Sequence, residues 1–202
     1  LVRPLIESGT NQLLCSLALI KQSSTYFIER TIEGLFIPEF FNSKEMKSFV
    51  GKMIEQRGAE FTNTVKDYFQ DNGWQAETEI LMPTLGAPQK LGDIDVLLLS
   101  TDGRLIAIEC KNLQMAKTIS EVADVLNRCK GEGNKDELLK HINRVNWISK
   151  NIAQVIERVR FTGTVRSFEH YLLTNTEMPM QYVCNLPIRI DQIKSFRNIE
   201  DI

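Results

Sequence analysis

The segment GDIDVLLLSTDGRLIAIECKNL, from Gly92 to Leu113, constrains the fold of this chain more than any other segment. Two apolar runs flank a small polar turn, and each run has the length and composition of a buried β-strand. Three ionisable residues, Asp95, Glu109 and Lys111, interrupt these runs. An unpaired charge in a covered strand is costly. These side chains must therefore pair with one another, reach the end of the sheet or bind a ligand.

The turn between the two strands decides whether the three charges meet. Residues two apart in a strand face the same way, so Glu109 and Lys111 share a face. A two-residue turn would set Asp95 opposite Cys110, on the other face, whereas a three-residue turn ending at Gly103 would set it opposite Glu109. We expect the three-residue turn, because that turn needs a left-handed last residue, which glycine supplies.

The rest of the chain predicts helices around a sheet. Asn42 and Glu45 form a capping-box pattern that opens a long helix over 44–71, which Asn72-Gly73 ends. We also expect two short strands over 3–16, helices over 17–36, 120–128 and 135–158, the last of them opened by Asn134, and strands over 76–83, 167–175 and 187–190. This order predicts an α/β fold, a mixed β-sheet flanked by helices, with a ββα extension over 1–43 before a domain over 44–202.

Bulk properties narrow the class of protein. The 202 residues carry a net charge of −2, which does not indicate a chain that coats nucleic acid nonspecifically. Four scattered cysteines without a CxxC pair indicate reduced thiols in a cytoplasmic protein and no zinc site. No run is long enough for a membrane span, and we interpret the apolar run over 13–20 as core rather than a signal peptide. Because the chain begins with Leu1, we expect it to be a segment of a larger protein with further domains or subunits.

Two clustered carboxylates and an ammonium group point to phosphodiester chemistry. Asp95 and Glu109 offer the oxygen ligands that Mg²⁺ or Mn²⁺ prefers. Such a metal lowers the pKa of a bound water and neutralises charge on a phosphate. Lys111 is placed to orient or help deprotonate that water and to stabilise the transition state. The simpler alternative is a partly buried salt-bridge cluster at the end of the sheet.

The stretch GDIDVL…IAIECKN resembles the PD-(D/E)xK superfamily, the restriction-endonuclease-like nucleases. The resemblance covers about 44–175 and matches Asp95, then Glu109-Cys110-Lys111 fourteen residues on, within the expected order of helices and strands. It implies that Asp95 and Glu109 are metal ligands and Lys111 the catalytic lysine of an Mg²⁺-dependent endonuclease acting on DNA. It also implies a larger bacterial or phage-related protein, of the genome-defence type, in which another module chooses the target.

One position departs from that pattern. Related nucleases often place a glutamate on the first helix, but RGAEFTNTV over 57–65 has Thr62 where that glutamate would stand. Glu60 lies two residues earlier, roughly 200° around the helix. It becomes a third metal ligand only if the helix shifts or breaks at Gly58. The departure keeps open a catalytically inactive member of the fold used for nucleic-acid binding or assembly.

The segment KHINRVNWISK over 140–150 places Lys140, His141 and Arg144 together on an expected helix. These residues are candidates for holding DNA phosphates. The alternative is an ordinary solvated face of an amphipathic helix. The sequence does not separate DNA from RNA as the substrate, because phosphate chemistry is common to both, and it leaves open a homodimer.

Overall fold

The computed structural model describes residues 5–8, 12–113, 119–127, 136–180, 183 and 185–202. The chain divides into two compact units, Leu1–Arg57 and Gly58–Ile202. The division falls inside a helix rather than before it, where the sequence placed the domain boundary. The expected N-cap residue Asn134 lies outside the described residues.

The N-terminal unit contains the expected ββα elements. Strands β1 (Leu5–Ser8) and β2 (Gln12–Cys15) form an antiparallel hairpin, which precedes helix α1 (Leu17–Ile32). The short helix η1 (Pro38–Phe40) leads into α2 (Lys44–Asp71), whose first half belongs to this unit. The prediction that the run over 13–20 is core is wrong, because every residue from 13 to 19 is exposed. Apolar composition alone does not reveal whether a segment finds a covering partner.

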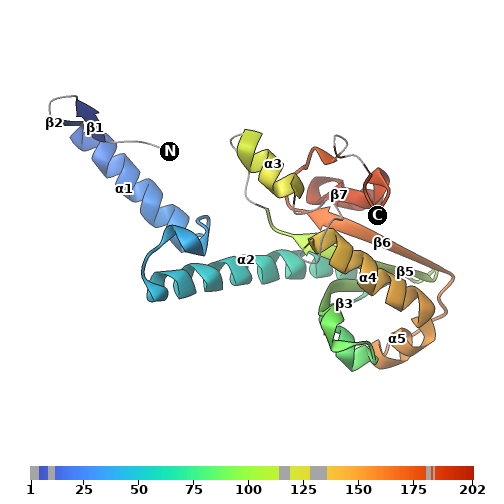
Figure 1. The fold of residues 1–202 in the computed structure, drawn as a ribbon. Helices are drawn as coiled ribbons and strands as arrows, with labels where there is room; N and C mark the ends of the chain where they lie inside the picture. The colour runs from blue at the N-terminus through green and yellow to red at the C-terminus, as the bar shows by residue number, and fades with distance from the viewer. Residues whose placement is uncertain (1–4, 9–11, 114–118, 128–135, 181–182, 184) are drawn as a thin grey trace. The chain divides into compact units, whose positions relative to one another are not determined.

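The C-terminal unit is built on a five-stranded mixed sheet with the order β3-β4-β5-β6-β7 (Figure 1). Strands β3, β4 and β5 form an antiparallel meander. Strand β6 pairs in parallel with β5, and β7 pairs in parallel with β6. This arrangement confirms the predicted α/β class with a mixed sheet flanked by helices. The last strand lies at 193–195, so the short strand expected over 187–190 is wrong. The strands are β3 (Gln75–Leu81), β4 (Asp93–Leu99), β5 (Arg104–Lys111), β6 (Ser167–Thr174) and β7 (Ile193–Ser195).

The turn between β4 and β5 has the expected three residues. Leu99 pairs with Leu105, and the Ser100 N–H donates to the Arg104 carbonyl at 3.0 Å. Gly103 takes a φ of 91°, in the left-handed region. A Cβ at this position would lie 2.4 Å from the Thr164 carbonyl oxygen, so a side chain here would be doubly penalised. The last pair of this register is Val96 with Ile108, so Asp95 and Glu109 are the next residues along the two strands.

Helices cover both faces of the sheet. The second half of α2 is continuous through Gly58 and packs Phe61, Val65 and Phe69 into one core cluster. On the other face, Val145 and Ile148 join a second cluster with side chains of β4 and β5. The helices after β5 are α3 (Ile119–Asn127), α4 (Glu137–Lys150) and α5 (Ile152–Val159). Short 3₁₀ helices are η2 (Met82–Leu85), η3 (Gln89–Leu91), η5 (Ile190–Gln192) and η6 (Phe196–Asp201).

The single helix expected over 135–158 is two helices. Asn151 has a φ of −133° and ψ of 28°, which interrupts the helix between α4 and α5. Its side chain donates to the Trp147 carbonyl at 2.8 Å, which satisfies an acceptor at the end of α4. The start of α4 is capped by Asp136, whose carboxylate accepts from the Leu139 N–H at 2.9 Å. Among the described residues, no helix combines the length and the hydropathy needed to cross a bilayer.

Candidate active site

Asp95, Glu109 and Lys111 come together at the end of strands β4 and β5. Along β5, Leu105 and Ala107 belong to the core cluster that includes α4, so alternation directs Glu109 and Lys111 toward the same face. The Asp95 carboxylate accepts a hydrogen bond from the Cys110 N–H at 2.7 Å. This bond joins β4 to β5 just beyond Val96 and Ile108, the last paired residues of the two strands. The structure thus pairs Glu109 with Lys111 and holds the Asp95 carboxylate against the backbone of the residue between them.

Glu109 is the centre of the cluster and is only 3% exposed. Its Oε1 lies 2.9 Å from Lys111 Nζ, and its Oε2 accepts a hydrogen bond from Arg144 Nη1. His141 Nδ1 approaches the same Oε2 at 3.7 Å. A buried carboxylate needs this compensation, because its charge loses the stabilisation that water provides.

Lys111 is held as a cation. Burial opposes its charge, but ion pairs with Glu109 and with Glu137, at 3.4 Å, outweigh that effect and raise the pKa of Lys111. A raised pKa makes the ammonium a poor proton acceptor at neutral pH. Of the two roles expected for this lysine, charge stabilisation therefore fits the geometry, and deprotonation of water does not. Glu137, the first residue of α4, is a member of the cluster that sequence reasoning missed.

Asp95 carries a charge that the cluster does not fully compensate. Burial and the neighbouring negative charge of Glu109 raise the pKa of Asp95 from 3.8 to about 7, against the opposing effects of Lys111 and the Cys110 N–H. Such a carboxyl is close to half protonated at neutral pH. A cation placed beside it would lower its pKa again.

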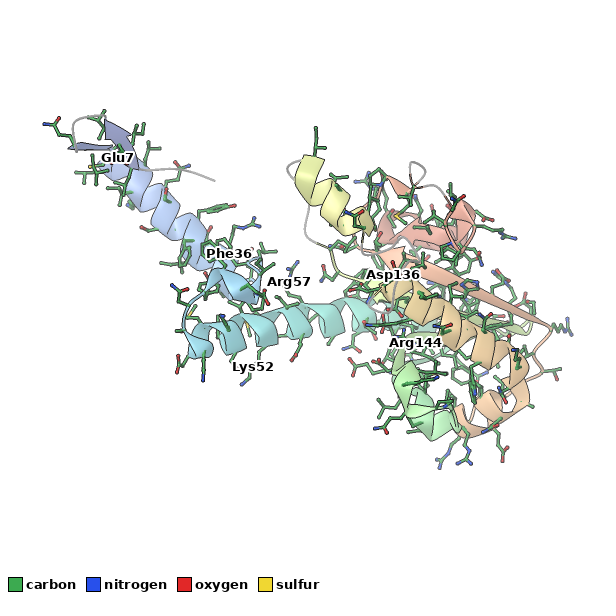
Figure 2. All side chains as sticks on the ribbon, viewed as in Figure 1. Glu7, Phe36, Lys52, Arg57, Asp136 and Arg144 are labelled. Atoms are coloured by element: carbon green, nitrogen blue, oxygen red, sulfur yellow. The ribbon has the colours of Figure 1, made fainter. Side chains whose placement is uncertain are left out.

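Of the three residues on α4 that we expected to bind phosphate, two point into the protein interior. His141 and Arg144 are 2% and 7% exposed, and Figure 2 labels Arg144 on this helix. Besides Glu109, Arg144 donates from Nε to the Leu91 carbonyl at 2.8 Å. The predicted nucleic-acid-binding face is thus wrong for His141 and Arg144, and so is the alternative of a solvated face. Lys140 is exposed, and its role in binding phosphates stays a prediction.

Two histidines lie beside the cluster, His141 on α4 and His170 on β6. Their ring centroids are 5.4 Å apart. Burial, together with the neighbouring His170 and Arg144, lowers the pKa of His141 to about 3, so its ring is neutral. His141 Nε2 and His170 Nδ1 are both buried without a hydrogen-bond partner. The sequence of β6 does not reveal this contact, because His141 lies on a helix well before that strand.

The first-helix residues lie apart from the charged cluster. Thr62 is buried on the face of the sheet that α2 covers, where its side chain hydrogen-bonds that of Cys110. Glu60 is exposed on the unbroken helix. The break at Gly58 that would bring Glu60 toward a metal is absent, so the structure does not support Glu60 as a ligand.

The carboxylate pair fits a divalent cation in its chemistry. Asp95 and Glu109 supply hard oxygen donors, and a cation beside Asp95 would oppose the effect of burial and of Glu109, which raise its pKa. Within the described ranges, no cluster of three or more histidine, cysteine, aspartate or glutamate side chains has the arrangement of a metal site. The remaining ligands of a cation at this pair would be water and substrate oxygens, as Mg²⁺ commonly retains.

Comparison with known proteins identifies a family. Neither the search of curated proteins nor the search of solved structures found a similar protein. A sequence model of the family described as "Anti-phage protein Upx-like" matches residues 2–195, almost the whole chain. The chain therefore belongs to the Upx-like family of anti-phage proteins.

Proposed function

We propose that this protein is a metal-dependent phosphodiesterase that cleaves DNA as part of an anti-phage defence. In this proposal Asp95 and Glu109 hold Mg²⁺ or Mn²⁺, and Lys111 is the catalytic lysine. The activity is that of the PD-(D/E)xK nucleases, which the strand pair around Asp95, Glu109 and Lys111 resembles. For an anti-phage family the target is invading DNA, whose backbone supplies the phosphodiester that this site would attack.

The observation that carries the proposal is the Glu109–Lys111 ion pair at the end of β5, with the Asp95 carboxylate bound to the Cys110 N–H between them. The three-residue turn at Gly103 sets the register that allows it. Burial first, and then the neighbouring charge of Glu109, raise the pKa of Asp95. Folding tolerates such repulsion at a cost, and sites with strongly perturbed carboxyls are frequently functional.

Each side chain has a role that its surroundings favour. A bound divalent cation would lower the pKa of its water ligand and neutralise charge on the phosphate. The Lys111 ammonium, held protonated by Glu109 and Glu137, would stabilise the negative charge that develops on the phosphoryl oxygens. Arg144 fixes the orientation of Glu109 through its second carboxylate oxygen. Nothing in this arrangement reads the sugar, so the choice of DNA over RNA rests on the family.

The test is cleavage of supercoiled plasmid DNA with Mg²⁺ or Mn²⁺, compared between the wild type and Lys111→Ala. We expect metal-dependent cutting that Lys111→Ala reduces by about 100-fold or more. Lys150→Ala, which removes an exposed lysine at the end of α4, is the matched control and should cut like the wild type. Circular dichroism melts establish that the variants are folded. Equal residual cutting by wild type and Lys111→Ala would contradict the proposal, and a single-stranded RNA of the same sequence tests the RNA-cleaving alternative.

A second candidate function is a catalytically inactive module that binds nucleic acid or assembles with partners. The observation that favours it is that cations already occupy both oxygens of Glu109, Lys111 on one and Arg144 on the other. Thr62, in place of the first-helix glutamate, points the same way. Retention of plasmid DNA in a mobility-shift assay, unchanged by EDTA and without any cutting, would support this function over the nuclease.

A further inference from the structure

Lys111 lies between two acids that belong to different elements. Its Nζ is 2.9 Å from Glu109 Oε1 on β5 and 3.4 Å from Glu137 Oε2 on α4. The side chain of Glu109 is 4% exposed, whereas that of Glu137 is 36% exposed. The ammonium group is therefore shared between a buried carboxylate and one that reaches the protein surface.

The two cations on Glu109 differ in how firmly the protein holds them. Arg144 also donates from Nε to the Leu91 carbonyl at 2.8 Å, and its side chain is 9% exposed. Lys111 has a flexible stem, a side chain that is 25% exposed and a second acid within reach. A cation that competes for Glu109 would therefore displace Lys111 rather than Arg144.

A displaced Lys111 needs another acid as its partner, because an unpaired ammonium is costly in a largely buried position. Burial lowers the pKa of Lys111, and three acids raise it, namely Glu109, Glu137 and Asp95. Asp95 and Glu109 are the two carboxylates that the proposed function assigns to the divalent cation. Glu137 is then the acid among these three that remains for Lys111.

Helix α4 fixes the backbone of Glu137 at the end of β5. The preceding residue, Asp136, is labelled in Figure 2 and caps the helix by accepting from the Leu139 N–H at 2.9 Å. The following residue, Leu138, is completely buried in a core cluster with Leu172 of β6. Because both neighbours are anchored, the carboxylate of Glu137 is presented to Lys111 from a rigid element.

We propose that Glu137 is a positioning residue that holds the Lys111 ammonium when a divalent cation replaces that ammonium on Glu109. This inference rests on the proposed function, since it takes Asp95 and Glu109 as the ligands of the cation. In the Glu109–Lys111 pair, the ammonium occupies a carboxylate oxygen that the cation would take. Glu137 keeps the displaced ammonium paired and close to the acids, where it would stabilise charge on a phosphate.

The experiment is calorimetric titration of the full chain with Mn²⁺, in a double-mutant cycle of Glu137→Gln and Lys111→Met. We expect Glu137→Gln to raise the Mn²⁺ dissociation constant by about 10-fold, because Lys111 then has no acid to receive it. Lys111→Met should lower the constant by about 5-fold or more, because it removes the competing cation. In the Lys111→Met background, Glu137→Gln should change the constant by about 2-fold or less.

The matched control is Glu157→Gln, which removes an exposed acid from α5 and should bind Mn²⁺ like the wild type. Circular dichroism melts show whether each variant is folded, and Lys111→Gln replaces Lys111→Met in the cycle if that variant unfolds. A Glu137→Gln variant that loses stability but keeps its Mn²⁺ affinity would overturn the proposal, because Glu137 would then serve only the helix dipole.

Two further outcomes of the cycle would overturn the inference alone. Equal effects of Glu137→Gln in the wild type and in Lys111→Met would mean that Glu137 attracts the cation directly and does not act through Lys111. A Lys111→Met variant that binds Mn²⁺ no more tightly than the wild type would mean that the ammonium does not compete for Glu109. A wild type that binds no Mn²⁺ would overturn the proposed metal site, and this inference with it.

Discussion

The two faces of β5 differ in their residues. On one face, Ile106, Ile108 and Cys110 pack in a core with α2. On the other face, which α4 covers, the apolar residues Leu105 and Ala107 are followed by the charged residues Glu109 and Lys111. Both faces are buried, yet only one carries charge. Cys110 remains a thiol, because burial raises its pKa well above the ordinary value. Glu109 lies between two cations, Arg144 from α4 and Lys111 from β5.

The comparison shows where buried charge is tolerated in this fold. The helix over the charged face supplies two side chains, His141 and Arg144, that point at the acid, whereas the helix over the apolar face supplies Phe61 and Val65. A difference of this kind is costly to maintain for stability alone, since apolar residues would fill the same space. The proposed metal site would account for the retention of these charges.

The largest expected effect comes from removing the arginine on the charged face. Arg144→Ala leaves Glu109 with one fewer cation and the Leu91 carbonyl without its donor. We expect the free energy of unfolding in urea to fall by about 3–5 kcal/mol. Arg189→Ala breaks a fully exposed pair with Asp191 and should change nothing measurable. A loss for Arg144→Ala as small as that of the control would show that Glu109 does not depend on it.

Truncation on the apolar face should cost somewhat less. Ile108 is completely buried, and Ile108→Ala removes methylene and methyl groups from the α2 core without touching a charge. We expect a loss of about 3 kcal/mol in urea unfolding, with no dependence on pH between 5 and 8. A pH-dependent loss would mean that this face is coupled to the charged cluster.

The next effect is a pH dependence that belongs to the charged face alone. Asp95 has a pKa of about 7 in the folded chain and an ordinary value of 3.8. Its contribution to stability is therefore complete below pH 4 and is lost as the pH rises through 7. Asp95→Asn mimics the protonated form and still accepts from the Cys110 N–H. It should equal the wild type at pH 4 and exceed its stability by on the order of 4 kcal/mol at pH 8, because each pKa unit corresponds to about 1.4 kcal/mol.

That comparison needs urea melts of both proteins at each pH. His141, whose pKa is lowered to about 3, contributes the opposite trend, because its stability is lost as the pH falls below its ordinary value of 6.5. Since both proteins contain His141, its effect cancels in the difference. Parallel curves for the wild type and Asp95→Asn would show that Asp95 does not carry a raised pKa.

The smallest effect should come from Thr62 on the apolar face. Thr62→Val keeps the shape and loses only the hydrogen bond to the Cys110 side chain. We expect the free energy of unfolding to fall by less than about 1 kcal/mol and metal-dependent cleavage to stay unchanged. A loss of cleavage would place Thr62 closer to the chemistry than its face of the sheet suggests.

Local patterns predicted most of the secondary structure. Helix α2 has the expected bounds, because its apolar stripe is a local signal, but the expected cap at Asn42 is wrong: Ser43 Oγ accepts from the Met46 N–H at 3.1 Å. The register of β4 and β5 followed from the position of Gly103 in the turn. The break at Asn151 was missed, since the apolar spacing continues from α4 into α5 and does not record one residue's φ and ψ.

The sequence predicted only the part of the candidate site that lies on β4 and β5. Asp95, Glu109 and Lys111 could be grouped because a strand pair places them together. Arg144 and His141 belong to the same cluster, but they lie more than thirty residues away from Glu109, and their sequence pattern equally fits an exposed basic face. The prediction that the apolar run over 13–20 is buried was wrong for the same reason, because burial depends on contacts with other segments that composition does not reveal.

The most direct test of the account is calorimetric titration of the chain with Mn²⁺, comparing the wild type with Asp95→Asn. The account predicts that the wild type binds one Mn²⁺ and that Asp95→Asn weakens binding by about 10-fold or more. Asp67→Asn, which changes an exposed acid on α2, should bind like the wild type. Equal binding by wild type and Asp95→Asn, or no binding by the wild type, would contradict a metal site at Asp95 and Glu109.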